Sequence, residues 1–206
     1  MNILAFGAHP DDIETLMGGT IAKYSQNKHD VLMVIVTLTD QEIRIKESEN
    51  AAKILGSKIK ILNLDPYKLL FDRHLVQTFD KIIQDFLPDV VYTPWIHDSH
   101  QHHIVVSAAS IAATRKNTCS LYMYEQAIPG GITPYGFKPQ AFVDISDTIK
   151  KKIKAVSQHQ SQIKNFGEQW IYGIEARAKY WGFQIGKEYA ETFEIIKYIK
   201  KIPNNR

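Results

Sequence analysis

In the stretch "NILAFGAHPDD", residues 2–12, a short apolar run ends in a turn rich in polar side chains. An unbroken apolar run of this length predicts a buried strand. The turn carries His9, Asp11 and Asp12. Two neighbouring carboxylates repel each other, and Gly or Asn would make a simpler strand exit. The residues after this strand are therefore candidates for chemistry.

The rest of the chain alternates between strand-like and helix-like segments. The nearly unbroken apolar run "VLMVIVTL", residues 31–38, is typical of a parallel strand covered on both faces. Such alternation predicts an α/β protein with a Rossmann-like three-layer fold, a mostly parallel sheet and helices on both faces. Further strands are predicted over 58–64, 89–94, 119–126 and 141–145, and helices over 14–28, 42–56, 75–86, 102–116 and 146–163.

Glycines and capping residues mark the ends and contacts of these elements. Gly18 and Gly19 each weaken the first predicted helix by about 1 kcal/mol, which indicates close packing against a neighbour. Gly56 is placed to end the second helix. Ser146 or Asp147 is expected to cap the last predicted helix. Before that helix, residues 127–140 collect Pro and Gly into one loop.

Length and composition predict one soluble globular domain spanning residues 1–206. The 206 residues suit a single domain, with 44% hydrophobic and 23% charged residues. The single Cys119 excludes an internal disulfide framework and fits a reducing cytoplasm. The start of the chain has no basic leader or cleavage site, and no apolar run reaches the roughly 20 residues that span a bilayer.

The charge balance does not suggest a nucleic-acid partner. The net charge is only +3 at pH 7. The lysine-rich run at residues 150–154 is expected to form a solvated helix face. A nucleotide-binding module is not supported either, because no G-x-G-x-x-G motif follows the first strand.

Two segments of metal-ligating residue types fall at one predicted edge of the sheet. Ligands bind beyond the carboxyl ends of parallel strands, where the first turn and "PWIHDSHQHH", residues 94–103, both lie. Nitrogen and carboxylate ligands suit Zn²⁺, and a catalytic zinc takes three of them plus water. Taken alone, "PDD" also fits a simple turn, and "HQHH" a surface cluster. The candidates are His9, Asp11, Asp12, Asp98, His100, His102 and His103.

The stretch "AHPDDIETLMGGTIA", residues 8–22, resembles the signature of the PIG-L/LmbE family of zinc-dependent N-deacetylases. The resemblance continues in the family's order through "RIKESENAAKILG", "PDVVYTP", "DSHQHH", "FVDIS", "HQSQ" and "YAETFEI", and so covers nearly the whole chain. It implies a metal-dependent amidohydrolase that uses Zn²⁺, or Fe²⁺ or another divalent metal in vivo. The implied substrate is a small-molecule N-acetylated amino sugar or glycoconjugate.

The resemblance also implies roles for individual residues. It places the metal on His9, Asp12 and His103, with Asp11 as the general base. Zinc lowers the pKa of bound water to about 7, and a carboxylate then completes the deprotonation. His100 is expected to stabilise the oxyanion as an imidazolium and to protonate the leaving amine.

One position departs from the family pattern. The family commonly has Asp immediately before the last histidine, where this chain has His102. The lost carboxylate is expected to lower the pKa of His100 and to loosen its orientation. Asp98 either compensates by orienting His100 or acts only as a loop cap. The departure leaves an alternative function, a catalytically weakened member that binds zinc and sugar.

Substrate contacts are predicted at two further residues. Arg44 aligns with an arginine that the family uses near its substrate, although on a helix it also fits a surface ion pair. Trp95 is placed to stack on a sugar ring. His159 of "HQSQ" matches a family position and equally fits an interhelical histidine with satisfied partners.

A homo-oligomer is a further expectation. The aromatic residues expected to serve as core or loop anchors are Tyr135, Trp170 and Trp181.

Overall fold

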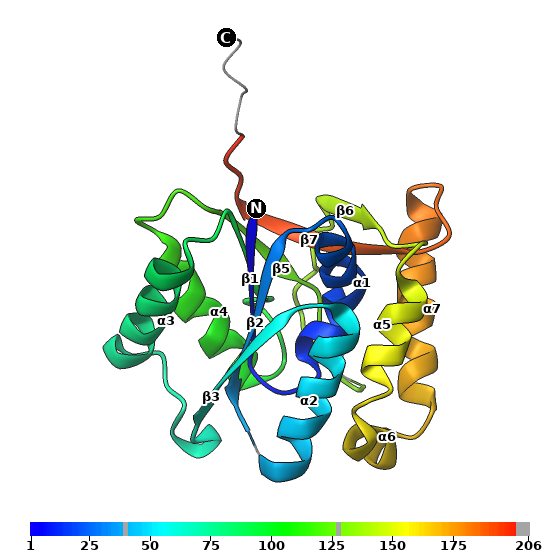
Figure 1. Ribbon diagram of the computed structural model, residues 1–206, viewed down its shortest axis with the longest axis horizontal. Coiled ribbons are helices and arrows are strands. Elements are labelled where there is room, and N and C mark those ends of the chain that lie inside the picture. The colour runs from blue at the N-terminus through cyan, green and yellow to red at the C-terminus, as the bar shows by residue number, and fades with distance from the viewer. Residues whose placement is uncertain (39–40, 127–128, 201–206) are drawn as a thin grey trace.

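The computed structural model describes residues 1–38, 41–126 and 129–200, and one sheet runs through all three parts (Figure 1). Its strands are β1 (Asn2–Gly7), β2 (Asp30–Thr37), β3 (Lys58–Leu64), β4 (Val90–Pro94), β5 (Ser120–Tyr124), β6 (Ala141–Asp144) and β7 (Ala190–Lys197). Their order across the sheet is β3-β2-β1-β4-β5-β7-β6. The strands from β3 to β5 are parallel, and β7 is antiparallel to β5 and β6. The predicted α/β class with a mostly parallel sheet is confirmed.

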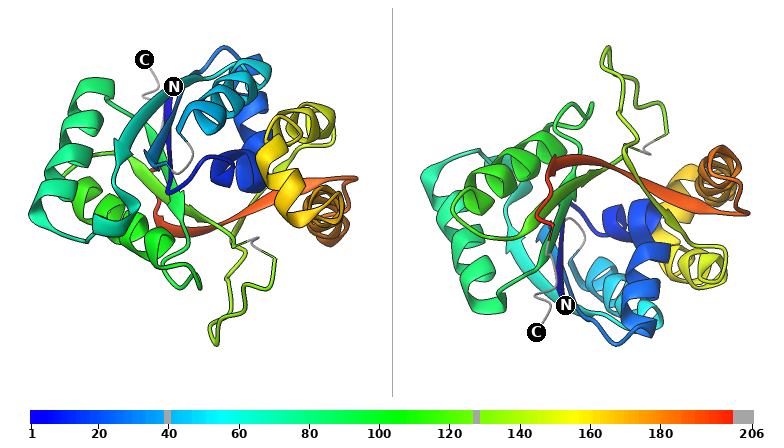
Figure 2. Two further views of the ribbon diagram at one scale, coloured as in Figure 1. Left: turned by 90° about the horizontal axis from the view of Figure 1, so that it is seen from below. Right: turned by 90° about the horizontal axis from the view of Figure 1, so that it is seen from above.

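Helices pack against both faces of the sheet. In the described residues they are α1 (Asp12–Gln26), α2 (Gln41–Leu55), α3 (Arg73–Phe86), α4 (Gln101–Thr114), α5 (Ile149–Val156), α6 (Gln160–Phe166) and α7 (Gln169–Gln184), with the 3-10 helix η1 (Pro66–Lys68). One face is covered by α1, α2 and α5, and the other by α3 and α4 (Figure 2). The predicted Rossmann-like three-layer arrangement is confirmed. Within the described residues, no helix has both the length and the apolar surface that a bilayer crossing demands.

The central strand β1 is buried on both faces. Ile3 and Ala5 pack in the core under α1, α2 and α5, whereas Leu4 and Phe6 pack in the core under α3 and α4. All four side chains are fully buried. Because both faces are covered, the strand has a continuous apolar run instead of an alternating one.

The strand order reverses between β1 and β4. The chain winds outward from β1 through β2 to β3 on one side, and β4 and β5 extend the sheet on the other. Ligands of doubly wound sheets bind in the crevice beyond the carboxyl ends of the strands at such a reversal. Residues 8–12, which follow β1, and residues 95–103, which follow β4, lie at this position.

Helix α1 is kinked, and a glutamate from β7 caps its second part. The kink lies at Met17, whose backbone is non-helical (φ −143°, ψ 19°). The backbone N–H groups of Gly19 and Thr20 donate to the two carboxylate oxygens of Glu191 at 3.0 and 2.7 Å. Lys152 is buried and contacts the same carboxylate at 2.6 Å. The last strand is thereby tied to the helix that begins at the candidate site.

The predicted close packing of the first helix is found at Gly19. A Cβ atom at this residue would lie 2.7 Å from Cδ1 of Ile145 and 2.8 Å from its Cβ. Gly56 ends α2 as expected, and its φ of +77° is a conformation that glycine adopts without strain.

The expectations for the last third of the chain need correction. The helix predicted over 146–163 is two helices, α5 and α6, and α5 is preceded by Thr148. Ser146 and Asp147 do not cap it, because Ser146 donates instead to the Asp144 carboxylate. The run 150–154 is not wholly a solvated face, because Lys152 is buried against a carboxylate. Helix α7 and strand β7 were not predicted, and residues 127–128 of the predicted loop lie outside the described residues.

Candidate functional site

A cavity of about 630 Å³ opens at the carboxyl edge of the sheet where the strand order reverses. Polar side chains from the turn after β1 and from the start of α4 line it. Arg44 from α2 and Gln162 from α6 add further polar atoms. Apolar lining comes from the segment around η1 and from α6 and α7. The predicted site residues found in the lining are His9, Asp11, Asp12, Arg44, His100, His102 and His103.

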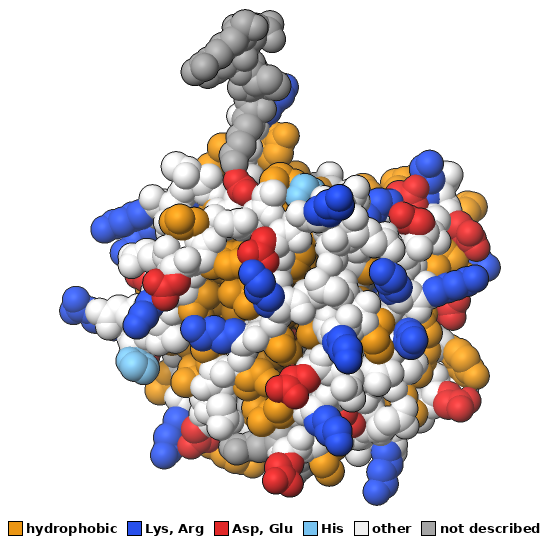
Figure 3. Space-filling view, viewed as in Figure 1, with side chains coloured by type: hydrophobic (Ala, Val, Ile, Leu, Met, Phe, Trp, Pro, Cys, Tyr) orange, Lys and Arg blue, Asp and Glu red, His pale blue; other side chains and the backbone are white. Residues whose placement is uncertain are grey.

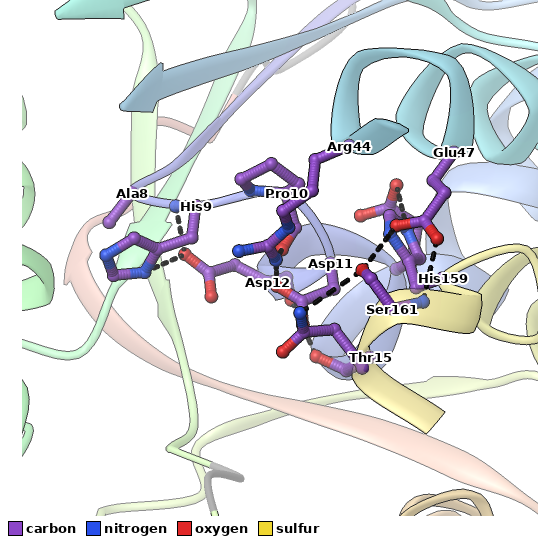
Figure 4. Close-up of polar contacts among 12 residues, drawn as sticks. Ala8, His9, Pro10, Asp11, Asp12, Thr15, Arg44, Glu47, His159 and Ser161 are labelled. Atoms are coloured by element: carbon purple, nitrogen blue, oxygen red, sulfur yellow. Dashed lines mark hydrogen bonds and ion pairs between the residues drawn. The ribbon is translucent and has the colours of Figure 1, made fainter. Parts of the chain in front are cut away.

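The turn after β1 points its two aspartates in different directions (Figure 4). Asp11 has a left-handed backbone with a φ of +90°, which Asp tolerates better than most residues. The carboxylate of Asp12 accepts a hydrogen bond from the His9 backbone N–H at 2.8 Å. Arg44 donates to the Pro10 carbonyl at 2.7 Å and to the Asp11 carboxylate at 3.3 Å. These bonds hold the strained turn and keep the two carboxylates apart.

His9, Asp12 and His103 converge in a group that fits a divalent metal. His9 Nδ1 lies 3.2 Å from His103 Nε2, and the Asp12 oxygens lie 3.6 Å and 3.3 Å from these two atoms. Ligands held at about 2.0–2.1 Å in tetrahedral geometry are separated by roughly 3.3 Å. Two imidazoles and one carboxylate are also the donor set of many catalytic zinc sites. The three residues predicted as metal ligands are therefore brought together in a suitable arrangement.

Asp98 contacts His103, one of the three candidate metal ligands. Its Oδ2 lies 2.8 Å from His103 Nδ1, whereas its Oδ1 accepts only the backbone N–H of His100. Burial would lower the pKa of His103, but Asp12 and then Asp98 raise it to about 10. The expectation that Asp98 orients the His100 ring is wrong, because its carboxylate contacts the neighbouring ring instead. A carboxylate behind a ligating histidine fixes the tautomer and orientation of the ring.

His102, the departure from the family pattern, contacts the other ligating histidine. Its Nδ1 lies 2.8 Å from His9 Nε2, and its ring also forms a hydrogen bond with the Pro66 backbone. Burial, then His9, lowers the pKa of His102, and the bond to Pro66 opposes this. A neutral His102 accepts the Nε2–H of His9, which leaves His9 Nδ1 free to face Asp12. The rings of His9 and His103, the two candidate histidine ligands, are thus each oriented by a neighbouring side chain.

The surroundings of the His100 ring disfavour its charged form. Burial, then the rings of His9, His103 and His102, lowers the pKa of His100 to about 4. Its Nδ1 accepts the backbone N–H of His102 at 3.2 Å, so the proton of the neutral ring lies on Nε2. Partial burial and the three neighbouring rings oppose the positive charge of the expected imidazolium, and the catalytic role of His100 stays a prediction.

Asp11 and Arg44 form a buried pair at the cavity. Burial, then the charge of Asp12, raises the pKa of Asp11 to about 7, and Arg44 opposes the rise. Arg44 is only 8% exposed, so the alternative of a surface ion pair is excluded. A carboxylate with a pKa near neutral can both take up and release a proton at physiological pH.

A second polar cluster lies behind Asp11 and joins α1, α2 and α6 (Figure 4). His159 Nε2 lies 3.1 Å from Oε1 of Glu14, and both side chains are fully buried. The carboxylate of Glu47 accepts the backbone N–H and the hydroxyl of Ser161 at 2.8 and 2.7 Å. His159 therefore lies between helices with a hydrogen-bond partner, which is one of the two roles predicted for it.

Trp95 does not reach the cavity. It is 2% exposed, its Nε1 donates to Glu194, and its ring packs against Phe137. The expected stacking of Trp95 on a sugar is therefore not possible in this structure. Tyr135 packs on His97 and Trp181 bonds to Glu125, in keeping with their expected anchoring roles.

Known proteins resemble the chain in sequence and in structure. The family model PIG-L, described as GlcNAc-PI de-N-acetylase, matches residues 4–114. The chain belongs to the PIG-L family. Diacetylchitobiose deacetylase from Thermococcus kodakarensis is 30% identical over 221 aligned positions, which cover 94% of this chain and 82% of that protein. The predicted family is confirmed, and with it the class of amidohydrolases to which its members belong.

Two solved structures share the fold. The conserved protein TT1542 from Thermus thermophilus superimposes with a TM-score of 0.83 and 25% identity, covering 99% of this chain and 98% of that one. N,N'-diacetylchitobiose deacetylase from Pyrococcus horikoshii, solved with its inhibitor MPG, has a TM-score of 0.80 and 28% identity, covering 95% and 84%. These PIG-L-type relatives extend the similarity beyond the matched first half of the chain.

Several lining residues of this PIG-L chain were not predicted from the sequence. They are Thr15, Leu16, Pro66, Tyr67, Leu69, Gln101, Pro129, Gln162, Phe166 and, in a lining role, Trp170. The "HQSQ" segment points to His159 in the sequence, and Gln162 is its last residue. The residues around η1 carry no such signal, because a short segment between a strand and a helix does not reveal from its sequence that it borders a cavity.

Proposed function

We propose that this chain removes the N-acetyl group from an N-acetylated amino sugar or sugar conjugate, with Zn²⁺ as its metal. The observation that supports this most directly is the cluster of His9, Asp12 and His103 beside Asp11 in one cavity. The deacetylase relatives named above act on N-acetylated sugars by their names. A bound divalent metal polarises a carbonyl and lowers the pKa of water.

The residues around this site have separate roles in amide hydrolysis. Asp11 accepts a proton from the water that attacks the acetamide carbon. The neutral Nε2–H of His100 donates a hydrogen bond to the oxygen that becomes negative in the tetrahedral intermediate. Asp11 then passes its proton to the amine nitrogen as the C–N bond breaks, which releases acetate and the free amino sugar. Arg44 holds Asp11 in place for both transfers.

Acetate release tests this function. We expect acetate from N-acetylglucosamine or N,N'-diacetylchitobiose with zinc present, and none after chelation. His103→Ala is expected to lose both metal and activity. His97→Ala, which removes an exposed histidine outside the cavity, is the matched control. Zinc and sugar binding without acetate release would instead favour the weakened, binding-only member.

Three broader expectations accompany this proposal. We propose that residues 1–206 act as one domain, that the protein works in the cytoplasm, and that it forms a homo-oligomer. A nucleic-acid partner is not proposed. On the face that Figure 3 presents, Lys and Arg side chains are interspersed with Asp and Glu, as the small net charge of +3 suggests. Limited proteolysis, cell fractionation and light scattering would test the three expectations in turn.

A further inference from the structure

The loop between β4 and α4 is held by a side chain from outside the cavity. In this loop, Asp98 contacts the ring of His103, and His100 lines the cavity. Ser99 lies between them in the sequence. Gln126, which follows β5, forms two hydrogen bonds with Ser99. Gln126 is buried and lies outside the cavity lining, so it can act on the site only through the loop.

The two hydrogen bonds allow one orientation of the Gln126 amide. Its Oε1 accepts the backbone N–H of Ser99 at 3.1 Å, and its Nε2 donates to the Ser99 hydroxyl at 2.8 Å. A backbone N–H can only donate, so the amide oxygen must face it and the amide nitrogen must face the hydroxyl. One side chain from the end of the neighbouring strand β5 thus fixes both the backbone and the side chain of Ser99.

The position of the Ser99 backbone bears directly on its two neighbours. The N–H that Gln126 accepts belongs to the peptide bond between Asp98 and Ser99. The next N–H, that of His100, donates to Asp98 Oδ1 at 2.8 Å, and Asp98 Oδ2 lies 2.8 Å from His103 Nδ1. Because each peptide unit is planar and rigid, a shift of Ser99 moves the backbone of Asp98 and the start of α4 together.

The start of the same loop is attached less firmly to β5. The backbone N–H of Ile96 faces Sδ of Met123 at 3.4 Å, and a thioether is a weak acceptor. Trp95 Nε1 donates to Glu194 of β7 at 3.1 Å. Farther along the loop, Gln126 supplies two hydrogen bonds of ordinary length.

We propose that Gln126 is a positioning residue for the metal group and for His100. It holds Ser99, and through Ser99 it sets the positions of Asp98 and His100. This inference rests on the proposed function, which gives those two residues their roles. Loss of the hydrogen-bond partner of a metal ligand lowers metal affinity or activity by about 10–100-fold, and Gln126 acts one step farther away. The expected effect is therefore on the order of tenfold.

Zinc affinity and the kinetics of acetate release test this role. Gln126→Met keeps the approximate size of the side chain and removes both hydrogen bonds. It should lower zinc affinity and kcat each by on the order of tenfold, with little change in KM, because Gln126 does not touch the substrate. Gln126→Glu should stay close to the wild type, since its carboxylate accepts the Ser99 N–H and the Ser99 hydroxyl can donate to it.

Gln140→Ala is the matched control. Gln140 also accepts a backbone N–H, that of Ile195, and it lies outside the cavity lining. Its loss should leave zinc affinity and kcat unchanged. All affinities are measured by competition with a chelator, at a temperature at which circular dichroism shows each protein to be folded. A loss of stability alone then does not lower them.

The outcomes separate the positioning role from the proposed function. Wild-type zinc affinity in Gln126→Met, or an equal loss in Gln126→Glu, overturns the role. If Gln126→Met does not fold, Ser99→Ala decides, because it removes only the hydroxyl of an exposed residue. Lower zinc affinity in Ser99→Ala supports the role, and wild-type affinity overturns it. No acetate from the wild type refutes the deacetylation instead, and zinc affinity still decides the role of Gln126.

Discussion

Two adjacent carboxylates in one turn have different surroundings. Asp12 faces His9 and His103, which hold its pKa well below the usual range against the effect of burial. Asp11 faces Arg44, and its pKa is raised to about 7 by burial and by Asp12. The left-handed backbone at Asp11 is what sends the two side chains apart. The different surroundings therefore suit Asp12 to the proposed role of metal ligand and Asp11 to the proposed role of general base.

We expect Asp11→Asn to keep its metal and to lose most of its turnover. Asn has nearly the same shape but cannot accept the proton, and general bases contribute roughly 10²–10⁴-fold. Metal analysis and kcat should be measured on the same sample. Loss of metal in this variant would show that the roles of the two aspartates are exchanged.

Asp98→Asn should weaken metal binding, because the carboxylate lies 2.8 Å from Nδ1 of the ligand His103. Substitution of the residue that forms a hydrogen bond with a ligating histidine typically lowers metal affinity or activity by about 10–100-fold. Competition with a chelator of known affinity measures this effect. Asp11→Asn, which removes a charge from the cavity lining itself, is the control. Unchanged affinity with a strongly reduced kcat would mean that Asp98 acts on His100 after all.

At the scale of the elements, the site depends on how closely α1 packs against the last part of the chain. Gly19 lies against Ile145, and Glu191 caps the part of α1 that follows its kink. The position of α1 matters because its first residue is Asp12, one of the three candidate metal ligands.

We expect Gly19→Ala to lower the free energy of unfolding by about 1–3 kcal/mol, since the new Cβ overpacks a filled core. The Cβ would lie 2.7–2.9 Å from three Ile145 atoms. Gly173→Ala on α7 is the matched control, because a Cβ there meets nothing within 4 Å. It should be neutral or stabilising by up to about 1 kcal/mol, as Ala is the better helix former. Urea unfolding measures both, and equal effects would contradict the packing argument.

The attachment of α6 to α1 should depend on pH through His159. Burial lowers the pKa of His159, but Glu14, and then Asp11 and Glu47, raise it above its ordinary value. A raised pKa in the folded state adds stability that is complete below the unfolded pKa of about 6.5 and is lost as pH rises through the folded pKa.

The difference in unfolding free energy between wild type and His159→Gln should therefore be largest at acidic pH and shrink as the pH rises. Gln keeps much of the size of the ring but cannot become charged. Parallel urea titrations across this pH range measure the difference. A difference that is constant with pH would mean that His159 has the same pKa in the folded and unfolded states, which would contradict the proposed coupling.

At the scale of the whole molecule, the metal group joins parts of the chain that are far apart in sequence. His9 and His103 are separated by 94 positions, and they follow neighbouring strands of the sheet. A ligand that binds only the folded state stabilises it by mass action. The site should therefore contribute to the stability of the whole sheet.

Removal of the metal by a chelator should lower Tm in the wild type and have no effect in His103→Ala. With free metal at 1,000 times Kd, the stabilisation is about 4.1 kcal/mol. Differential scanning calorimetry with and without added zinc measures it. An identical Tm in the presence and absence of metal would argue against the proposed ligands.

The parallel part of the sheet and the metal group were predictable because both depend on local sequence. A strand buried on both faces needs a continuous apolar run, which residues 2–7 and 31–37 display. Parallel strands bring their carboxyl ends to one edge, so that the polar residues after β1 and β4 were expected together, and the family resemblance singled out His9, Asp12 and His103 among them. The family resemblance added their roles.

Only the tertiary structure shows which neighbouring group each polar side chain contacts. Asp98 could orient either His100 or His103, and the choice depends on rotamers that the spacing of residues does not specify. Lys152 is buried because Glu191, 39 positions away, needs a counter-charge. Tyr67 and Phe166 border one cavity because layers on opposite faces of the sheet meet at its edge. Local sequence determines what a segment can form, whereas contacts between distant segments determine what it touches.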